Sequence, residues 1–190
     1  MRTRALASLG LVAACGSSVI APLRGDAALV REIALVPQPT IVMTIRAPAN
    51  ELGVSLGAAI GTVVASTQIY DVDAIGPPFA RYLDRVTATR DVTVEVGLPI
   101  RRAPMPPPDG DIRIGELPGG TAARIVHLGS RGRLGDAHRE LDRWIADHRR
   151  RELGPRWEVY LTDPTTEPDE TAQRTVVFAP LASAAHEVTR

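Results

Sequence analysis

Two segments of the chain repeat one pattern of glycine, proline and aromatic residues. Gly76–Tyr82 and Gly154–Tyr160 both read Gly-Pro-x-aromatic-x-x-Tyr, and Val36–Thr40 aligns with Leu117–Thr121 at a similar spacing. A repeat of about 80 residues in two copies is too long and too few in number for a solenoid. The pattern predicts a duplicated half-domain, with two halves packed about a pseudo-twofold axis and a ligand cleft between them.

Each copy is expected to form a strand hairpin, a helix and two further strands. Proline and glycine occupy both predicted reversals, at Pro37–Pro39 and Pro118–Gly120, as tight turns require. Helices are expected at Asn50–Ser66 and Leu134–Arg151, so the fold class is α+β with antiparallel sheets. The expected strands are Leu29–Val36, Thr40–Arg46, Phe79–Leu83 and Thr93–Leu98 in the first copy, and Asp111–Leu117, Thr121–Leu128, Trp157–Leu161 and Thr175–Phe178 in the second.

The length of the chain fits one well-cored domain. With 190 residues and 44% hydrophobic side chains, the chain is short for two independent cores. We expect a domain over residues 28–184, with half-modules at 28–98 and 110–181. Residues 99–109 contain five prolines and are expected to form an extended connector, and residues 185–190 a loose tail.

The charge balance argues against nucleic acid as a partner. The 22 basic and 22 acidic side chains give a formal net charge of zero, whereas nucleic-acid-binding domains usually carry a basic excess. The apolar run Leu52–Ala65 is also too short for a membrane span, which needs about 20 residues. Gly53, Gly57 and Gly61 fall four apart within this run, so the helix is expected to lie close against a sheet.

Residues 1–27 differ in character from the rest of the sequence. Arg2 and Arg4 precede the apolar run Ala5–Ala14, and Cys15 follows it, which is a signal-peptide pattern. The run Leu-Val-Ala-Ala before Cys15 is similar to a bacterial lipobox, so export and a lipid anchor on Cys15 at the cell membrane are expected. The alternative is a cytoplasmic protein with an ordinary N-terminal extension. A single cysteine cannot form an internal disulfide.

The repeated motif brings one carboxylate into a candidate ligand site. Because side chains alternate along a strand, Glu158 and Tyr160 share one face, and Ala80 and Tyr82 share the matching face of the other copy. A lone acid between two tyrosines suits an organic cation, through charge pairing and cation–π attraction. The alternative places Glu158 in solvent on a strand edge. Further candidate lining residues are Trp157, Phe79, His127 and Trp144.

The ordered set of motifs resembles the GyrI-like domain, also called the AraC-type effector-binding domain. The residues that carry the resemblance are Gly76–Tyr82, Leu117–Gly120, His127–Gly129, Gly154–Pro164 and Phe178–Leu181. The resemblance implies a two-module fold with a central pocket for a hydrophobic small molecule that can carry a positive charge, which the pocket glutamate, here Glu158, meets. The chain departs from the family after Gly129, where Ser130-Arg131 replaces a common Pro-Tyr. The loss of this aromatic predicts a more polar pocket rim.

Two other functions stay open from the sequence. Some members of the resembled family are similar to hydrolases of reactive, strained-ring compounds, in which Glu158 would act in acid/base catalysis with Tyr160 or Tyr82 as donor. The gyrase-inhibitor relatives suggest a protein-binding module instead. No cofactor is predicted. His127, His138 and His148 lack the spacing of a metal site, so we interpret them as packing or surface residues.

Overall fold

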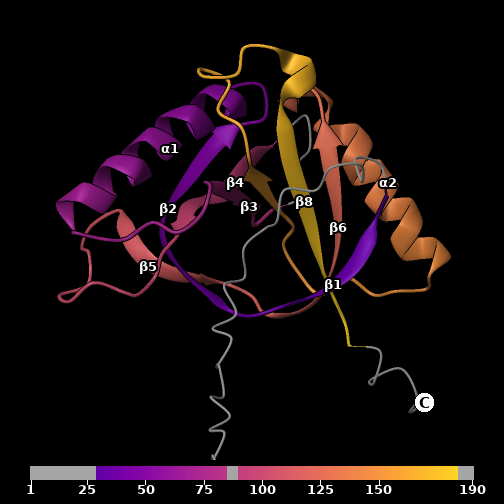
Figure 1. Cartoon of the computed structure of the whole chain (residues 1–190), viewed down its shortest axis with the longest axis horizontal. Coiled ribbons are helices and arrows are strands. Elements are labelled where there is room, and N and C mark those ends of the chain that lie inside the picture. Colours follow the sequence, from indigo (N-terminus) through magenta and orange to yellow (C-terminus); the bar gives the residue numbers. More distant parts are fainter. Residues whose placement is uncertain (1–28, 85–89, 184–190) are drawn as a thin grey trace, which may run out of the picture.

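The computed structural model of the protein describes residues 29–84 and 90–183. Within these residues the fold is α+β: two helices pack against one curled antiparallel sheet (Figure 1). The predicted leader, Cys15 and the tail at 185–190 lie outside the described residues.

The described residues form the following helices and strands in chain order: β1 Arg31–Leu35, β2 Gln38–Pro48, α1 Leu52–Ile69, β3 Phe79–Tyr82, β4 Asp91–Pro99, β5 Ile112–Leu117, β6 Gly120–Leu128, α2 Leu134–Asp147, β7 Trp157–Tyr160 and β8 Arg174–Leu181. Short 3₁₀ turns lie at Arg131–Arg133 and Glu170–Ala172.

The two predicted hairpins are wrong, although their strands exist. The strand order across the sheet is β1-β6-β8-β7-β3-β4-β2-β5. Strand β1 pairs with β6, and β2 pairs with β4 and β5, so neither β1 with β2 nor β5 with β6 forms a ladder. The first two strands of each half therefore pair with strands of the other half, which ties the halves into one sheet.

The proline and glycine residues mark bends in long strands instead of reversals. Leu35 pairs with Gly120, and Gln38, only three residues later, pairs with Leu117. The β1–β2 segment thus runs along the β5–β6 segment on both sides of one bend (Figure 1). At this crossing a side chain on Gly119 would meet Pro37 at 2.5 Å. Glycine is needed there because the two backbones approach too closely for a Cβ atom.

The sheet separates two layers of packed side chains. On one face, Phe79, Trp157 and Phe178 belong to a cluster with residues of β2, β6 and β8. On the other face, α1 packs over β2 and β4, and α2 packs over β6 and β8. Strands β3 and β7 meet at the centre of the sheet, between the regions that the two helices cover (Figure 1).

Helix α1 does not use its glycines to approach the sheet. Ala59 and Val63 are buried, whereas Gly53, Gly57 and Gly61 are exposed, with nothing within 4 Å of a Cβ atom added to them. The expectation of close glycine packing is wrong because the glycines lie on the solvent face.

Helix α1 is also longer than the expected apolar run. Its 18 residues have a mean hydropathy of 1.5. By length and composition this is enough for a membrane span, contrary to the sequence expectation.

Helix α2 ends four residues before its predicted end. Its last helical residue is Asp147, and Arg149 adopts a left-handed backbone with φ 51°. The arginine run that was expected to close the helix therefore follows it. Arg150 turns back to pair with Glu32 at 3.1 Å and donates to the Ala182 carbonyl at 3.0 Å, so it fastens the helix end to strand β1.

Candidate ligand-binding site

Glu158 lies at the centre of the sheet and is almost fully buried. The residue is 4% exposed, and in the β3–β7 ladder it pairs with Ala80. The phenol groups of Tyr82 and Tyr160 each donate a hydrogen bond to its Oε2 atom at 2.9 Å. The solvent-edge alternative for Glu158 is therefore wrong, since β7 is flanked by strands on both sides. Burial of a carboxylate in this way requires that its oxygens are hydrogen-bonded.

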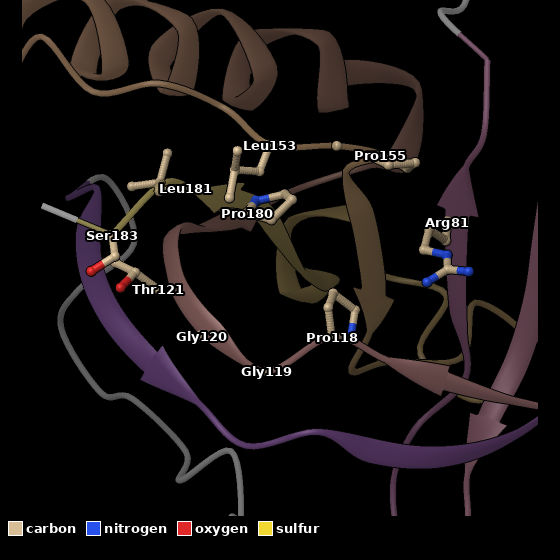
Figure 2. A pocket seen from close by; sticks show the side chains of 11 residues that line it. Arg81, Pro118, Gly119, Gly120, Thr121, Leu153, Pro155, Pro180, Leu181 and Ser183 are labelled. Atoms are coloured by element: carbon tan, nitrogen blue, oxygen red, sulfur yellow. The ribbon is translucent and has the colours of Figure 1, made fainter. Parts of the chain in front are cut away.

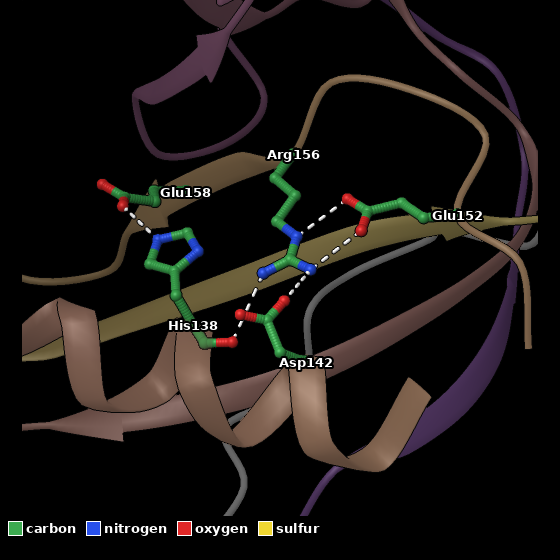
Figure 3. A network of polar contacts seen from close by, with 5 residues as sticks. All are labelled: His138, Asp142, Glu152, Arg156 and Glu158. Atoms are coloured by element: carbon green, nitrogen blue, oxygen red, sulfur yellow. Dashed lines mark hydrogen bonds and ion pairs between the residues drawn. The ribbon is translucent and has the colours of Figure 1, made fainter. Parts of the chain in front are cut away.

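Helix α2 supplies a partner that the sequence interpretation missed. His138 Nε2 lies 2.8 Å from Glu158 Oε1 (Figure 3), and its side chain is 27% exposed. His138 follows Leu134 by four residues and precedes Leu141 by three, both of which are buried. A polar residue on the buried stripe of a helix was the signal that could have identified it. His138 is neither a surface nor a simple packing residue.

Arg156 holds helix α2 against strand β7 beside this site. Its guanidinium contacts the Glu152 carboxylate at 2.8 Å and the Asp142 carboxylate at 2.5 Å, and it donates to the His138 carbonyl at 3.3 Å. Figure 3 shows these contacts converging on one side chain, which is 16% exposed. The backbone position from which His138 reaches Glu158 is thus fixed by a charged network.

Burial keeps both tyrosines in their protonated form. It raises the pKa of Tyr82 and of Tyr160 well above the usual value, and the negative charge of Glu158 raises each further. Removal of either phenolic proton would place a second negative charge beside a buried carboxylate. At neutral pH both side chains are therefore hydrogen-bond donors to Glu158.

A cation already covers the ring of Tyr160. The guanidinium carbon of Arg131 lies 4.3 Å from the centre of that ring, and the same group donates to the Thr162 carbonyl at 2.9 Å. Arg131 is one of the two residues at which the sequence departs from the resembled family. The departure thus replaces an expected aromatic with a fixed positive charge that contacts the site by a cation–π interaction.

Two predicted lining residues lie on the wrong face of the sheet. Phe79 pairs with Val159, and Trp157 stacks on Phe178 with ring centres 5.1 Å apart, in the cluster on the opposite face from Glu158. The alternation of side chains along β3 and β7 imposes this separation. A molecule in contact with the Glu158 carboxylate therefore cannot also contact Phe79 or Trp157.

The remaining predicted residues lie at different distances from Glu158. Ala80 is fully buried and directly opposite Glu158 in the ladder. His127 pairs with Thr175, as Tyr160 does from the other side, so two strand spacings, about 10 Å, separate His127 from Tyr160. Trp144, on α2, stacks on His148 with ring centres 4.1 Å apart and packs against the buried cluster between α2 and the sheet. The structure brings together Glu158, Tyr160, Tyr82 and Ala80.

A groove of about 510 Å³ lies away from this cluster. It is bordered by Arg81, by Pro118–Thr121 and by Leu153–Pro155 (Figure 2), and none of its lining residues bonds to Glu158. Arg81 pairs with Trp157 in the ladder and contacts Glu95 at 2.9 Å, so its charge is already met. In the Glu158 cluster itself, both carboxylate oxygens already have hydrogen-bond partners within the protein. In residues 29–84 and 90–183, no three His, Cys, Asp or Glu side chains are grouped to hold a metal ion.

Comparison with known proteins identifies the family of the domain. Residues 35–181 match the family model of the GyrI-like small molecule binding domain. The chain belongs to the GyrI-like family. The resemblance seen in the sequence motifs is thereby confirmed, and the protein is a small-molecule-binding domain. No curated protein has a matching sequence.

Several solved structures share the fold of this chain at low sequence identity. The C-terminal domain of EcmrR is 17% identical with a TM-score of 0.71, over 82% of this chain and 98% of that one. SAV2435 bound to tetraphenylphosphonium is 10% identical with a TM-score of 0.57, over 84% and 98%. A hydrolase from Listeria innocua is 11% identical with a TM-score of 0.56, over 83% and 94%. At these identities the likeness concerns the fold.

Proposed function

We propose that the protein binds a hydrophobic, positively charged small molecule at Glu158, as a sensor or a sequestering protein. The proposal rests on the carboxylate of Glu158, which is 4% exposed. In the part of the chain that the structure describes, no arginine pairs with it. Arg131, the fixed positive charge beside the site, contacts the Tyr160 ring and the Thr162 carbonyl. A buried acid with no permanent countercharge bonded to it is costly, and a cationic ligand would supply that charge. The tetraphenylphosphonium complex of SAV2435, a protein of the same fold, is consistent with this.

Binding of tetraphenylphosphonium to Glu158→Gln tests the proposal. Glutamine keeps the shape of the side chain and removes the charge, so affinity should fall at least tenfold, as expected for the loss of an attraction between opposite charges in a desolvated site. Titration calorimetry measures the affinity. Glu140→Gln on α2 is the matched control, because Glu140 pairs with Arg143 at the surface. Equal affinities of the wild type and Glu158→Gln would refute the role of Glu158.

A hydrolase is the second candidate, and one contact favours it. Glu158 and His138 form a carboxylate–histidine pair at 2.8 Å, with two phenol donors beside it, so groups able to move a proton are already assembled. A hydrolase from Listeria innocua has the same fold. Hydrolysis of a panel of epoxides, measured by product formation and lost in Glu158→Gln, would support an enzyme. Absence of turnover by the wild type would exclude this candidate.

We also infer that the fold arose by duplication. With β1–β4 matched to β5–β8, the strand order β1-β6-β8-β7-β3-β4-β2-β5 reads the same from either edge of the sheet. The repeated Gly-Pro motif precedes β3 in one half and β7 in the other.

Export with a lipid anchor on Cys15 stays a separate proposal, based on the leader sequence. Release of the protein from membranes by Cys15→Ser would support it, and an unchanged cell fractionation would refute it.

A further inference from the structure

The chain itself occupies the positions at which a cationic ligand would meet Glu158. Tyr82 and Tyr160 donate to Oε2, and His138 Nε2 lies against Oε1. Arg131 covers a face of the Tyr160 ring at 4.3 Å. A ligand that takes over one of these hydrogen bonds must first displace the group that makes it.

His138 is the partner that can leave without disturbing the sheet. The two tyrosines belong to β3 and β7, and Tyr160 is 4% exposed. The His138 side chain belongs to helix α2 and is 27% exposed. Because Arg156 holds the His138 carbonyl at 3.3 Å, the imidazole can rotate away while the helix stays in place. The Oε1 atom would then be open to a ligand.

We infer that His138 holds the place of a protonated amine, and that the ligand is a hydrophobic cation with an N–H group that displaces the imidazole from Glu158 Oε1. The inference rests on the proposed binding function. When the imidazole leaves, the buried Oε1 atom loses its hydrogen bond. A protonated amine supplies both a donor for that bond and a positive charge, whereas a quaternary cation supplies only the charge. His138 thus determines both the affinity and the type of cation.

Two matched probes and two substitutions test this role. The probes are N,N-dimethyl-2-naphthylmethylamine, which is protonated at neutral pH, and its N-methylated quaternary form, with affinities measured by calorimetry. The wild type should bind the amine about tenfold more tightly than the quaternary form. His138→Ala removes the competitor and should tighten binding of the amine about tenfold, whereas His138→Lys installs a permanent competitor and should weaken it at least tenfold. His148→Ala is the control, since His148 stacks on Trp144 away from Glu158.

The outcomes separate this inference from the proposed function. Opposite changes in His138→Ala and His138→Lys support the inference, because a merely structural role would weaken binding in both variants. Equal binding of the amine by the wild type and His138→Ala overturns it, as does equal affinity of the wild type for the two probes, while the function at Glu158 stands. If neither probe binds to the wild type or to His138→Ala, the proposed function fails as well. Thermal melting of each variant verifies the fold.

Discussion

Each half of the sheet contributes one tyrosine to the site, but only the β7 half contributes an acid. Tyr82 in β3 and Tyr160 in β7 donate to the same oxygen at 2.9 Å. Beyond this pair, the β3 half offers Ala80 and the apolar residues under α1. The β7 half offers Glu158, and α2 adds His138. The comparison teaches that a sheet whose strand order reads the same from either edge holds an asymmetric site, with its one acid in the β7 half.

The two helices also differ in polarity. Helix α1 leaves Val54 and Ile69 exposed at 82% and 75% and has no acidic residue in its first turn or basic residue in its last. Helix α2 carries Asp136, Glu140 and Asp142, each of which pairs with an arginine. One helix is thus a hydrophobic cover for its half of the sheet. The other is a polar helix from which His138 reaches Glu158.

The largest effect is expected when the asymmetry is abolished. Ala80→Glu would place a second carboxylate directly opposite Glu158 at a position with no exposure. A second buried carboxylate, with no hydrogen-bond partners of its own, should lower the free energy of unfolding by at least about 3 kcal/mol. Urea denaturation measures this, with Ala80→Gln as a control of similar size without charge. Similar stability of the two variants would show that charge does not distinguish the halves.

Removal of each tyrosine hydroxyl compares the two halves, because both hydrogen bonds to Glu158 are 2.9 Å long. Tyr160 is 4% exposed and Tyr82 is half-buried, so water can replace the lost donor more easily at Tyr82. We expect Tyr160→Phe to reduce the free energy of unfolding by roughly 2 kcal/mol and Tyr82→Phe by roughly 1 kcal/mol. Urea denaturation at neutral pH is the measurement. A larger loss in Tyr82→Phe would mean that burial does not control the contribution.

Alkaline pH should weaken the same two contacts. The folded protein raises the pKa of both tyrosines above their unfolded value, so it holds their protons more tightly than the unfolded chain does. Their contribution to stability is complete below about pH 10 and is lost as the pH rises above it. Unfolding midpoints measured from pH 8 to 11 should fall less steeply for Tyr82→Phe than for the wild type. Parallel curves would contradict the raised pKa.

The smallest effect is expected on the outer face of α1. Gly57 and Gly61 have open space where a Cβ atom would lie, so alanine should stabilise the helix by about 1 kcal/mol at each position. Gly119→Ala provides the contrast, because its Cβ would collide with Pro37, and this variant should be less stable. Thermal denaturation compares the three variants. Destabilisation by Gly57→Ala would indicate that the glycine face packs against another molecule.

Local sequence patterns predicted the positions of the helices and strands better than they predicted which strands pair. The strands and both helices were placed within a few residues, since alternation and helical periodicity depend on near neighbours. The hairpins were wrong because Pro37 and Pro118–Gly119 are compatible with a bend as well as a reversal, and which one forms depends on contacts between the distant strands β1 and β6. Trp157 and Phe79 were assigned to the site on aromatic character, although alternation already placed them on the other face.

The sequence alone determined the α+β class, the family motifs and the set of one acid with two tyrosines, because these follow from residue identity and the two-residue period of a strand. The tertiary structure decided that Glu158 is covered by His138 and that Arg131 covers Tyr160. Those contacts join residues far apart on different elements. They arise from how α2 and the turn before it pack on the sheet, which no local pattern specifies.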